Sequence, residues 1–337
     1  MFQPSLADLT AGGLRQARFH EQAAALTRSN FGREVFVRAV VEVSNFCREN
    51  CHYCGMRRDN VDLDRYRARL DNLGDWLLNR RPASVTELNI QSGEDPIAVR
   101  EVVLPLIRLL RRETRLGIIV SLGTLDDRLY HDLREAGATV YILKFETADP
   151  TRYTALEAPG TLTERLRHLR HLAASGWRVS SGFIVGLPGE SANALLRSLS
   201  LASELPLSGC SVSPFIAGPQ TPLQGAPEPN ADWTLNCMAA LRMMRPDWVI
   251  PAVSALNLAA ADGYLRGLRA GANLVTINLT PTPVRDDYVI YRRDRAVMTE
   301  ERVLAALEAE GLRPSASGLV EHLERCRAPR LESTTVE

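Results

Sequence analysis

The chain has 337 residues, and 45% of them are hydrophobic, which is enough for a large buried core. Its 40 basic and 40 acidic side chains cancel, so the composition gives no reason to expect a nucleic acid or an anionic membrane as a partner. We see no secretory leader and no run of about 18 apolar residues, and we therefore expect a cytoplasmic protein without a membrane span.

Short β-branched runs alternate with amphipathic helical runs along most of the chain. Helical patterns within 7–29 come first, and about eight strand–helix repeats follow. The strands are expected at 34–43, 85–91, 117–122, 139–144, 178–185, 209–215, 248–253 and 273–277. Alternating βα units predict a parallel sheet. Their number favours an α/β fold with a complete or nearly complete (βα)8 barrel of the TIM type over an open doubly wound sheet.

The same pattern predicts three segments. We expect an N-terminal helical cap at 1–33, a βα barrel at 34–315, and a C-terminal segment at 316–337 that ends in a disordered polar tail. Functional groups of such a barrel lie on the loops that follow the carboxyl ends of the strands. The motifs described next all fall at such positions.

Three of the six cysteines lie within eight residues, directly after the first predicted strand. Cys47, Cys51 and Cys54 have the spacing C-x3-C-x2-C. Clustering of this kind in a chain with few cysteines indicates a metal site rather than disulfides. Three thiolates can bind three irons of a 4Fe–4S cubane and leave the fourth iron open to a small ligand.

Zinc and unrelated free thiols are the alternatives for this motif. Zinc usually takes four protein ligands, and the nearest extra candidate, His52, sits between two of the cysteines. Chance clustering would not be expected to fall on the loop after the first strand of a barrel. The iron–sulfur cluster is therefore the favoured interpretation.

Polar motifs also follow the second and third predicted strands. Ser92, Gly93 and Glu94 come after the second strand, and Ser121 ends the third. The glycine allows close approach of the backbone to a ligand, and the glutamate can accept a hydrogen bond from an ammonium group. We expect these residues to contact a cofactor.

The fourth strand ends in Lys144 and Glu146, and Arg165 opens the next helix. A buried carboxylate needs a partner, which for Glu146 is either a bound ligand or a structural salt bridge with Lys144 or Arg165. Arg165 is suited to bind a carboxylate through two parallel hydrogen bonds.

The cysteine motif, with Tyr53 before its third cysteine, resembles the signature of the radical S-adenosylmethionine (SAM) superfamily. The resemblance implies that SAM binds the open iron and is cleaved reductively to a 5′-deoxyadenosyl radical. The segment at Gly93 and Glu94 resembles the element that meets the amino group of SAM. The segment 182–190 resembles the adenine-contacting element, which implies that adenine meets Ile184, Gly186, Leu187 and Pro188.

Within the superfamily the chain resembles the biotin synthase group over about residues 34–315, above all the FeFe-hydrogenase maturases of the HydE type. That resemblance implies a small iron complex with cysteine, carbonyl and cyanide ligands as substrate. Residues 263–280 also resemble 3-methylornithine synthase, which implies an amino-acid substrate and a mutase as the alternative.

The positions expected to face the substrate depart from the HydE pattern. Lys144 and Phe145 stand where HydE has Arg-His, and 276–279 reads TINL where HydE has Met-Pro-Asn-Trp. The substrate therefore stays open. The candidate substrate residues are Lys144, Ser254, Asn257, Thr276 and Asn278, although the last four could equally serve hydrogen bonds of the barrel rim.

Two kinds of partner follow from this chemistry. A low-potential cluster needs an electron donor, for which flavodoxin or ferredoxin is expected, and Arg57 and Arg58 beside the cluster could receive an acidic donor. Other hydrogenase maturases are further expected partners if the HydE interpretation holds. A hypothesis from a different class, an iron–sulfur or zinc scaffold protein without catalysis, would leave the SAM-type loops without a purpose.

Overall fold

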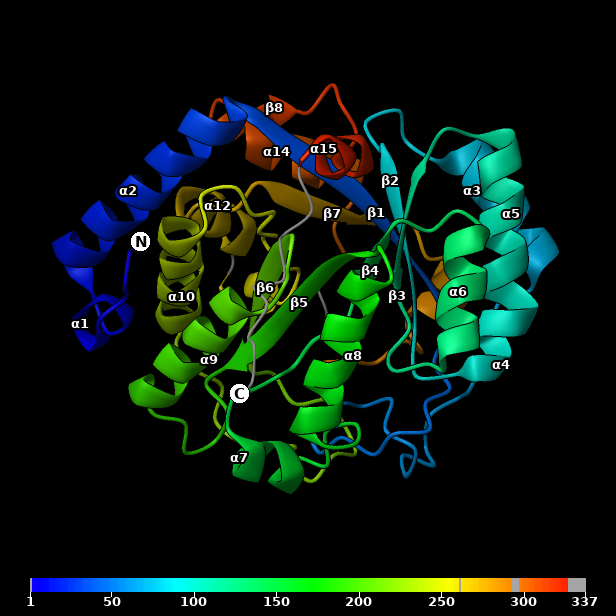
Figure 1. The fold of residues 1–337 in the computed structure, drawn as a ribbon, viewed down its shortest axis with the longest axis horizontal. Helices are drawn as coiled ribbons and strands as arrows, with labels where there is room; N and C mark the ends of the chain where they lie inside the picture. Colours follow the sequence, from blue (N-terminus) through cyan, green and yellow to red (C-terminus); the bar gives the residue numbers. More distant parts are fainter. Residues whose placement is uncertain (1, 261, 293–296, 327–337) are drawn as a thin grey trace, which may run out of the picture.

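The parallel strands of the computed structural model form one curled sheet with helices around it (Figure 1). The structure describes residues 2–260, 262–292 and 297–326, so the predicted disordered tail at 327–337 lies outside the described residues. The strand order is β6-β5-β4-β3-β2-β1-β7, and β8 pairs with the start of β1. The strands are β1 (Glu34–Ser44), β2 (Glu87–Ser92), β3 (Gly117–Ser121), β4 (Val140–Ile142), β5 (Arg178–Val185), β6 (Gly209–Pro214), β7 (Leu274–Asn278) and β8 (Arg313–Pro314).

The barrel closes between β6 and β7 in a different way from the prediction. The strand expected at 248–253 is wrong, because this segment forms only two isolated bridges, Gly209 with Val249 and Pro251 with Leu274. Pro251 has no N–H group to donate to a ladder, which limits pairing at this point. The two bridges still connect β6 to β7, so the sheet is a nearly complete barrel.

Helices cover the outside of the sheet, and their ends follow local capping signals. A capping box formed by Thr161 and Glu164 begins α8 (Leu162–Ala174), and Gly137 follows the end of α6 (Asp127–Glu135) with φ of 113°. The helices before β4 are α1 (Leu6–Leu9), α2 (Gly13–Phe31), α3 (Leu70–Arg80), α4 (Pro96–Ala98), the π-helical turn η1 (Val99–Val103), α5 (Leu104–Glu113) and α6 (Asp127–Glu135). Those after β4 are α7 (Pro150–Ala155), α8 (Leu162–Ala174), α9 (Ala192–Glu204), α10 (Ala231–Met244), α11 (Leu256–Ala259), α12 (Gly263–Arg269), α13 (Thr282–Arg285), α14 (Glu300–Ala309) and α15 (Leu319–Arg325).

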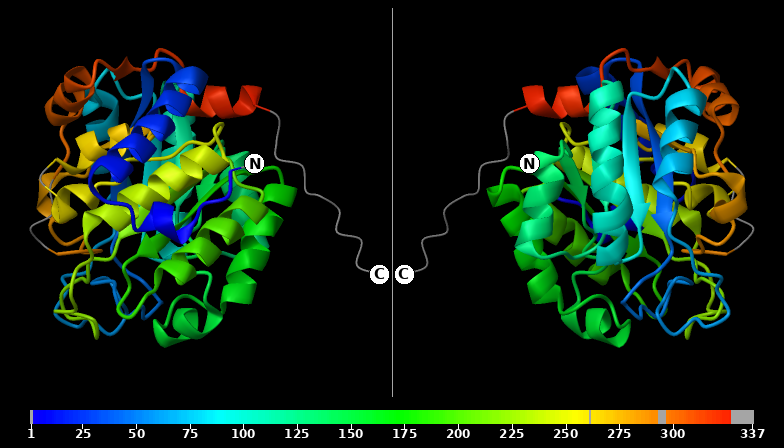
Figure 2. Two further views of the ribbon diagram at one scale, coloured as in Figure 1. Left: turned by 90° about the vertical axis from the view of Figure 1, so that its left-hand side faces the viewer. Right: turned by 90° about the vertical axis from the view of Figure 1, so that its right-hand side faces the viewer.

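The N-terminal helices lie against the outside of the barrel. Figure 2 shows α2 beside α10, and polar contacts tie the two helices together. Asn236 of α10 donates from Nδ2 to the carbonyls of Leu9 and Ala11, at 2.9 and 3.0 Å. Within the described residues, no helix is both long and apolar enough to cross a lipid bilayer.

Side chains alternate between the two faces of each strand, and this alternation creates an internal cavity. In β1, Val37, Ala39 and Val41 belong to the apolar layer under the helices, whereas Arg38 and Glu42 line the cavity. One end of the barrel is filled by a separate apolar cluster that includes Phe36, Ile119, Val140, Leu319 and Leu323. The cavity therefore lies toward the carboxyl ends of the strands.

Candidate active site

The cysteine loop runs between β1 and the residues that precede α3, and one arginine organises it. Arg65 donates from Nη1 to the carbonyls of Asn45 and Met56, at 2.6 and 2.9 Å. Its Nη2 donates to the carbonyls of Arg57 and Asn60, at 2.7 and 3.1 Å. A planar guanidinium can satisfy four carbonyls at once, and it therefore holds a loop that has no regular secondary structure.

The loop presents all three cysteines to the cavity, which has a volume of about 350 Å³. Burial raises the pKa of Cys47 and Cys51, and it raises that of Cys54 to about 12. Repulsion between neighbouring thiolates adds to the shift of Cys51 and Cys54. Three desolvated thiols that repel one another as anions need positive charge to become thiolates, and bound iron supplies such charge.

The surroundings of the cysteines fit a cubane cluster. The backbone N–H of Glu94 donates to Sγ of Cys47 at 3.4 Å. A Cβ on Gly93 would lie 2.2 Å from the carbonyl oxygen of Phe46, so only glycine allows this approach. Among the described residues no three His, Cys, Asp or Glu side chains are gathered tightly enough to hold a single metal ion, whereas a cubane offers three separate irons. His52 pairs with Glu157 instead, at 3.3 Å.

The side chain of Glu94 is already occupied by protein donors. Its Oε1 accepts from the N–H of Thr124 at 2.9 Å and from Nη1 of Arg165 at 3.3 Å, and its Oε2 faces Arg48 at 3.4 Å. Burial disfavours the charge of Arg165, but Glu94 together with Tyr153, Glu146 and Tyr53 outweighs this effect and raises the arginine pKa. Both residues line the cavity, and the pair joins the loop after β2 to the start of α8.

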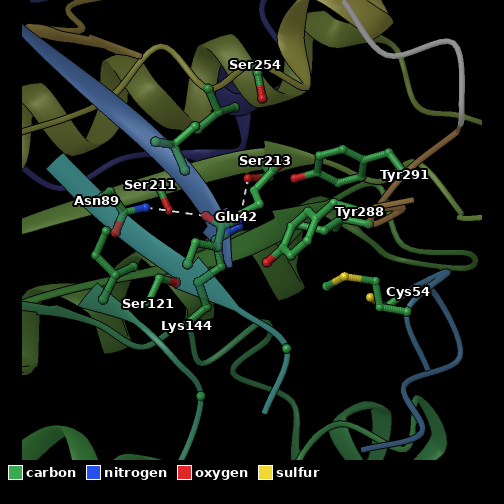
Figure 3. A pocket seen from close by; sticks show the side chains of 18 of the residues that line it. Glu42, Cys54, Asn89, Ser121, Lys144, Ser211, Ser213, Ser254, Tyr288 and Tyr291 are labelled. Atoms are coloured by element: carbon green, nitrogen blue, oxygen red, sulfur yellow. Dashed lines mark hydrogen bonds between the residues drawn. The ribbon is translucent and has the colours of Figure 1, made fainter. Parts of the chain in front are cut away.

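Glu146 extends the cavity wall beyond β4. It has a positive φ of 61°, and its backbone connects β4 to β5 through Gly182 and Ile184. Burial raises the pKa of its carboxyl group, while Lys144 and Arg165 oppose the rise. Neither cation forms an ion pair with it in the described part of the chain. Lys144 donates to Oγ of Ser213 at 2.9 Å (Figure 3), and Arg165 pairs with Glu94. The carboxylate is therefore available to a ligand.

Only part of the predicted adenine-contacting segment lines the cavity. Ile184 lines the cavity and packs with Tyr53, Leu187 and Phe215 in a small apolar cluster. Gly186, Leu187 and Pro188 are not among the described residues that line the cavity. Gly186 has φ of 84°, and its N–H donates to Oε2 of Glu190 at 2.7 Å.

The predicted substrate residues are mostly brought together. Lys144, Ser254, Thr276 and Asn278 line the same cavity as the cysteines, as do Ser92 and Ser121. Asn257 is not among the described lining residues. Its Oδ1 accepts from the N–H of Tyr264 at 2.9 Å and its Nδ2 points to the sulfur of Met298, so its amide serves contacts within the barrel wall.

Sequence reasoning missed several polar residues that line the cavity. Arg38 and Asn89 come from the middle of β1 and β2, and Tyr288 and Tyr291 come from the segment after β7. Figure 3 shows both tyrosine rings at the pocket, and Tyr288 packs in an apolar cluster with Met56 and Cys54. A charged residue inside the valine-rich run of β1 was a usable signal for Arg38, whereas nothing local marks the two tyrosines.

The geometry agrees with comparisons to known proteins. The model of the radical SAM superfamily matches residues 41–202. The chain is 34% identical to the [FeFe] hydrogenase maturase subunit HydE of Thermotoga maritima, over 83% of this chain and 80% of that protein. The chain belongs to the radical SAM superfamily. Radical SAM enzymes use a 4Fe–4S cluster and SAM, and the three thiols and the lined cavity suit both groups.

Two further comparisons place this radical SAM enzyme among its relatives. It is 27% identical to the 3-methylornithine synthase of Methanosarcina barkeri, over 88% of this chain and 85% of that protein. The crystal structure of methylornithine synthase (PylB) superposes with a TM-score of 0.84 at 26% identity and covers 96% of both chains. The predicted α/β barrel is thereby confirmed.

Proposed function

We propose that this radical SAM enzyme is a HydE-like maturase that acts on a small iron complex with a cysteine ligand during assembly of the FeFe-hydrogenase active site. The observation that carries the proposal is the 34% identity to HydE over 83% of the chain. The cavity adds support, because its cation Lys144, although it replaces the arginine of the HydE pattern, can attract an anionic complex.

We assign different binding roles to the residues that line the cavity. Cys47, Cys51 and Cys54 would hold the cluster, which when bound and reduced supplies the electron that cleaves SAM to a 5′-deoxyadenosyl radical. Arg165, fixed by Glu94, would bind the carboxylate of SAM, and Glu146 would accept hydrogen bonds from its amino or ribose groups. Since the side-chain oxygens of Glu94 are occupied, we infer that its loop meets the SAM amino group through backbone carbonyls.

A mutase of the methylornithine synthase kind is the second candidate. It is favoured by the superposition over 96% of both chains and by a cavity that holds both acidic and basic side chains. Such a cavity suits a zwitterionic amino acid.

The two candidates differ in the substrate that stimulates cleavage of SAM. The enzyme would be reconstituted anaerobically and reduced, and 5′-deoxyadenosine would be measured alone, with L-lysine, and with a synthetic iron–cysteine carbonyl cyanide complex. Stimulation by the iron complex supports the maturase, and stimulation by L-lysine supports the mutase. Cys51→Ala is the control without activity. No 5′-deoxyadenosine from an iron-loaded protein under any condition would contradict both.

Lys144 offers a sharper test of the maturase. Lys144→Arg restores the guanidinium of the HydE pattern and should keep or raise turnover of the iron complex. Lys144→Met removes the charge without shortening the side chain much and should reduce that turnover. Equal turnover in all three proteins would argue against a role for this cation in substrate binding.

We also propose a cytoplasmic location and a low-potential flavodoxin or ferredoxin as electron donor. A cluster held by three thiolates requires a reducing compartment. Arg58 is exposed on the cysteine loop and could face an acidic donor. Association with other hydrogenase maturases belongs to the maturase proposal and would be tested by co-purification.

A further inference from the structure

Arg38 sits deep in the cavity with few partners. It lies in the middle of β1, opposite Thr276 of β7, and Nη2 donates to Oγ1 of Thr276 at 3.1 Å. Its Nε is buried without a hydrogen-bond partner, and in the described part of the chain it forms no ion pair. Burial lowers the pKa of Arg38 to about 10, while Tyr264 and Glu87, which pairs with Arg38 from β2, favour the charged form. The guanidinium therefore still carries its charge at neutral pH.

Arg242 is a structural arginine of the same fold, and its hydrogen bonds can be compared with those of Arg38. Its side chain is fully buried, and it donates to the carbonyls of Gly271, Pro246 and Trp248 and to Oδ1 of Asn273. All three nitrogens of that guanidinium thereby donate hydrogen bonds. Arg38 has one such bond, its half-buried side chain lines the cavity, and its Nε is buried without a partner. Leaving a buried polar group unsatisfied is costly. The cost is explained if a ligand completes the site.

Asn89 supplies a second unsatisfied group on the neighbouring strand. The residue is 3% exposed, its Nδ2 donates to Oε1 of Gln91 at 3.4 Å, and its Oδ1 is buried without a partner. Asn89 pairs with Val40, two residues beyond Arg38, which places the two Cα atoms about 8 Å apart. Figure 3 shows Asn89 directed into the same pocket as Ser211 and Lys144.

We propose that Arg38 and Asn89 bind the head group of an α-amino acid, with the carboxylate on Arg38 and the amino group on Oδ1 of Asn89. One group is a cationic donor and the other a neutral acceptor, and an amino-acid head group offers the complementary pair within a few ångströms. The amino acid is either free or part of a metal complex, so this inference rests on the proposed function and deepens it.

This arrangement sets the orientation of the substrate. Arg38 lies four residues before Glu42 on β1, about 13 Å deeper along the strand, and the cysteine loop lies beyond Glu42. A head group held at Arg38 directs the side chain toward the cysteines and Glu146. The atom that reacts is then a side-chain atom, or a metal attached to it, rather than the α-carbon.

Equilibrium binding to the reconstituted, SAM-loaded enzyme would test the inference. Calorimetry would compare L-lysine with cadaverine and L-cysteine with cysteamine, because each amine lacks only the carboxylate. At least one amino acid should bind about 30-fold more tightly than its amine, as expected for a hydrogen bond to a charged group. Arg38→Met should remove this preference, Arg38→Lys should keep part of it, and Asn89→Leu should weaken both members of the pair.

Controls separate binding from folding. Arg128→Met removes a cation whose side chain is 90% exposed and should leave the affinities unchanged. Without ligand and at pH 5, where Glu87 opposite it is protonated, Arg38→Met should melt at the same temperature as the wild type or higher, because a charge with one hydrogen bond is removed. A purely structural Arg38 would instead lower the melting temperature.

Three results would overturn the inference: equal binding of acid and amine, unchanged affinities in Arg38→Met, or no binding of either amino acid by the wild type. Each leaves the proposed function standing if an iron complex or another substrate stimulates 5′-deoxyadenosine formation. If no substrate stimulates 5′-deoxyadenosine formation by the wild type, that separate result counts against the proposed function.

Discussion

Arg165 donates from Nη1 to Oε1 of Glu94 at 3.3 Å, and the two side chains are 5% and 6% exposed. The contact joins residues 71 positions apart and fixes the loop after β2 against the first turn of α8. Gly123 packs against the same carboxylate, where any Cβ would collide with Cγ of Glu94. The pair therefore shapes one wall of the cavity before any cofactor binds.

Glu94→Gln should destabilise the protein by about 3 kcal/mol, because it leaves the charge of Arg165 buried without its counter-ion. Urea unfolding of the cluster-free protein, followed by circular dichroism, measures the change. The matched control is Asp132→Asn, which breaks the exposed contact with Arg128 and should cost less than about 0.5 kcal/mol. A loss below about 1 kcal/mol for Glu94→Gln would mean that the pair contributes little.

Gly93→Ala should reduce loading of the cluster severely while the barrel still folds. The added Cβ would lie 2.2 Å from the carbonyl oxygen of Phe46 and 2.9 Å from Cβ of Cys47, so the cysteine loop must move. Iron content and visible absorbance after reconstitution provide the measurement. Gly12→Ala serves as the control, since its Cβ meets nothing within 4 Å. Normal iron content in Gly93→Ala would show that the loop yields at little cost.

Arg65→Lys should weaken the hold on the cysteine loop, because an ammonium cannot reach the four carbonyls that the guanidinium bonds. We expect faster amide hydrogen exchange over 45–60 and faster loss of the cluster in air. Arg58→Lys lies on the same loop with its side chain 61% exposed and should change neither rate. If both variants exchange at the wild-type rate, the four hydrogen bonds are not what orders the loop.

Glu87 should make the stability of the protein fall as the pH rises. Burial raises its pKa from 4.5 to about 7, while the Thr86 hydroxyl and N–H groups at the start of α15 limit the rise. The folded state therefore binds the proton more tightly than the unfolded state, and this contribution is present below about pH 4.5 and lost through about pH 7.

Glu87→Gln mimics the protonated form at every pH. Its melting temperature should exceed that of the wild type by about 2 °C or more at pH 8 and by much less at pH 5. Differential scanning calorimetry of the cluster-free protein at both values provides the test. A difference that does not change with pH would show that Glu87 does not titrate in this range.

Local patterns were sufficient for most of the fold. The β-branched runs and helical periodicity located the strands from β1 to β7 because burial on both faces of a parallel strand leaves a continuous apolar signature. The strand expected at 248–253 is the exception. Its composition is apolar, but Pro251 and the short contacts with β6 and β7 reduce it to two bridges. The two-residue β8 was too short to leave a pattern.

The sequence by itself determined the three cysteines, the loops after β2 and β4, and membership of the superfamily, because each signal lies within a few consecutive residues. Only the tertiary structure decided which residues share the cavity. Arg38, Asn89 and Tyr288 enter it from distant segments, while Gly186, Leu187, Pro188 and Asn257 lie outside its described lining. The physical reason is that strand curvature and register set which inward side chains meet. A short motif therefore predicts which residues bind a ligand, but not which side chains they contact across the barrel.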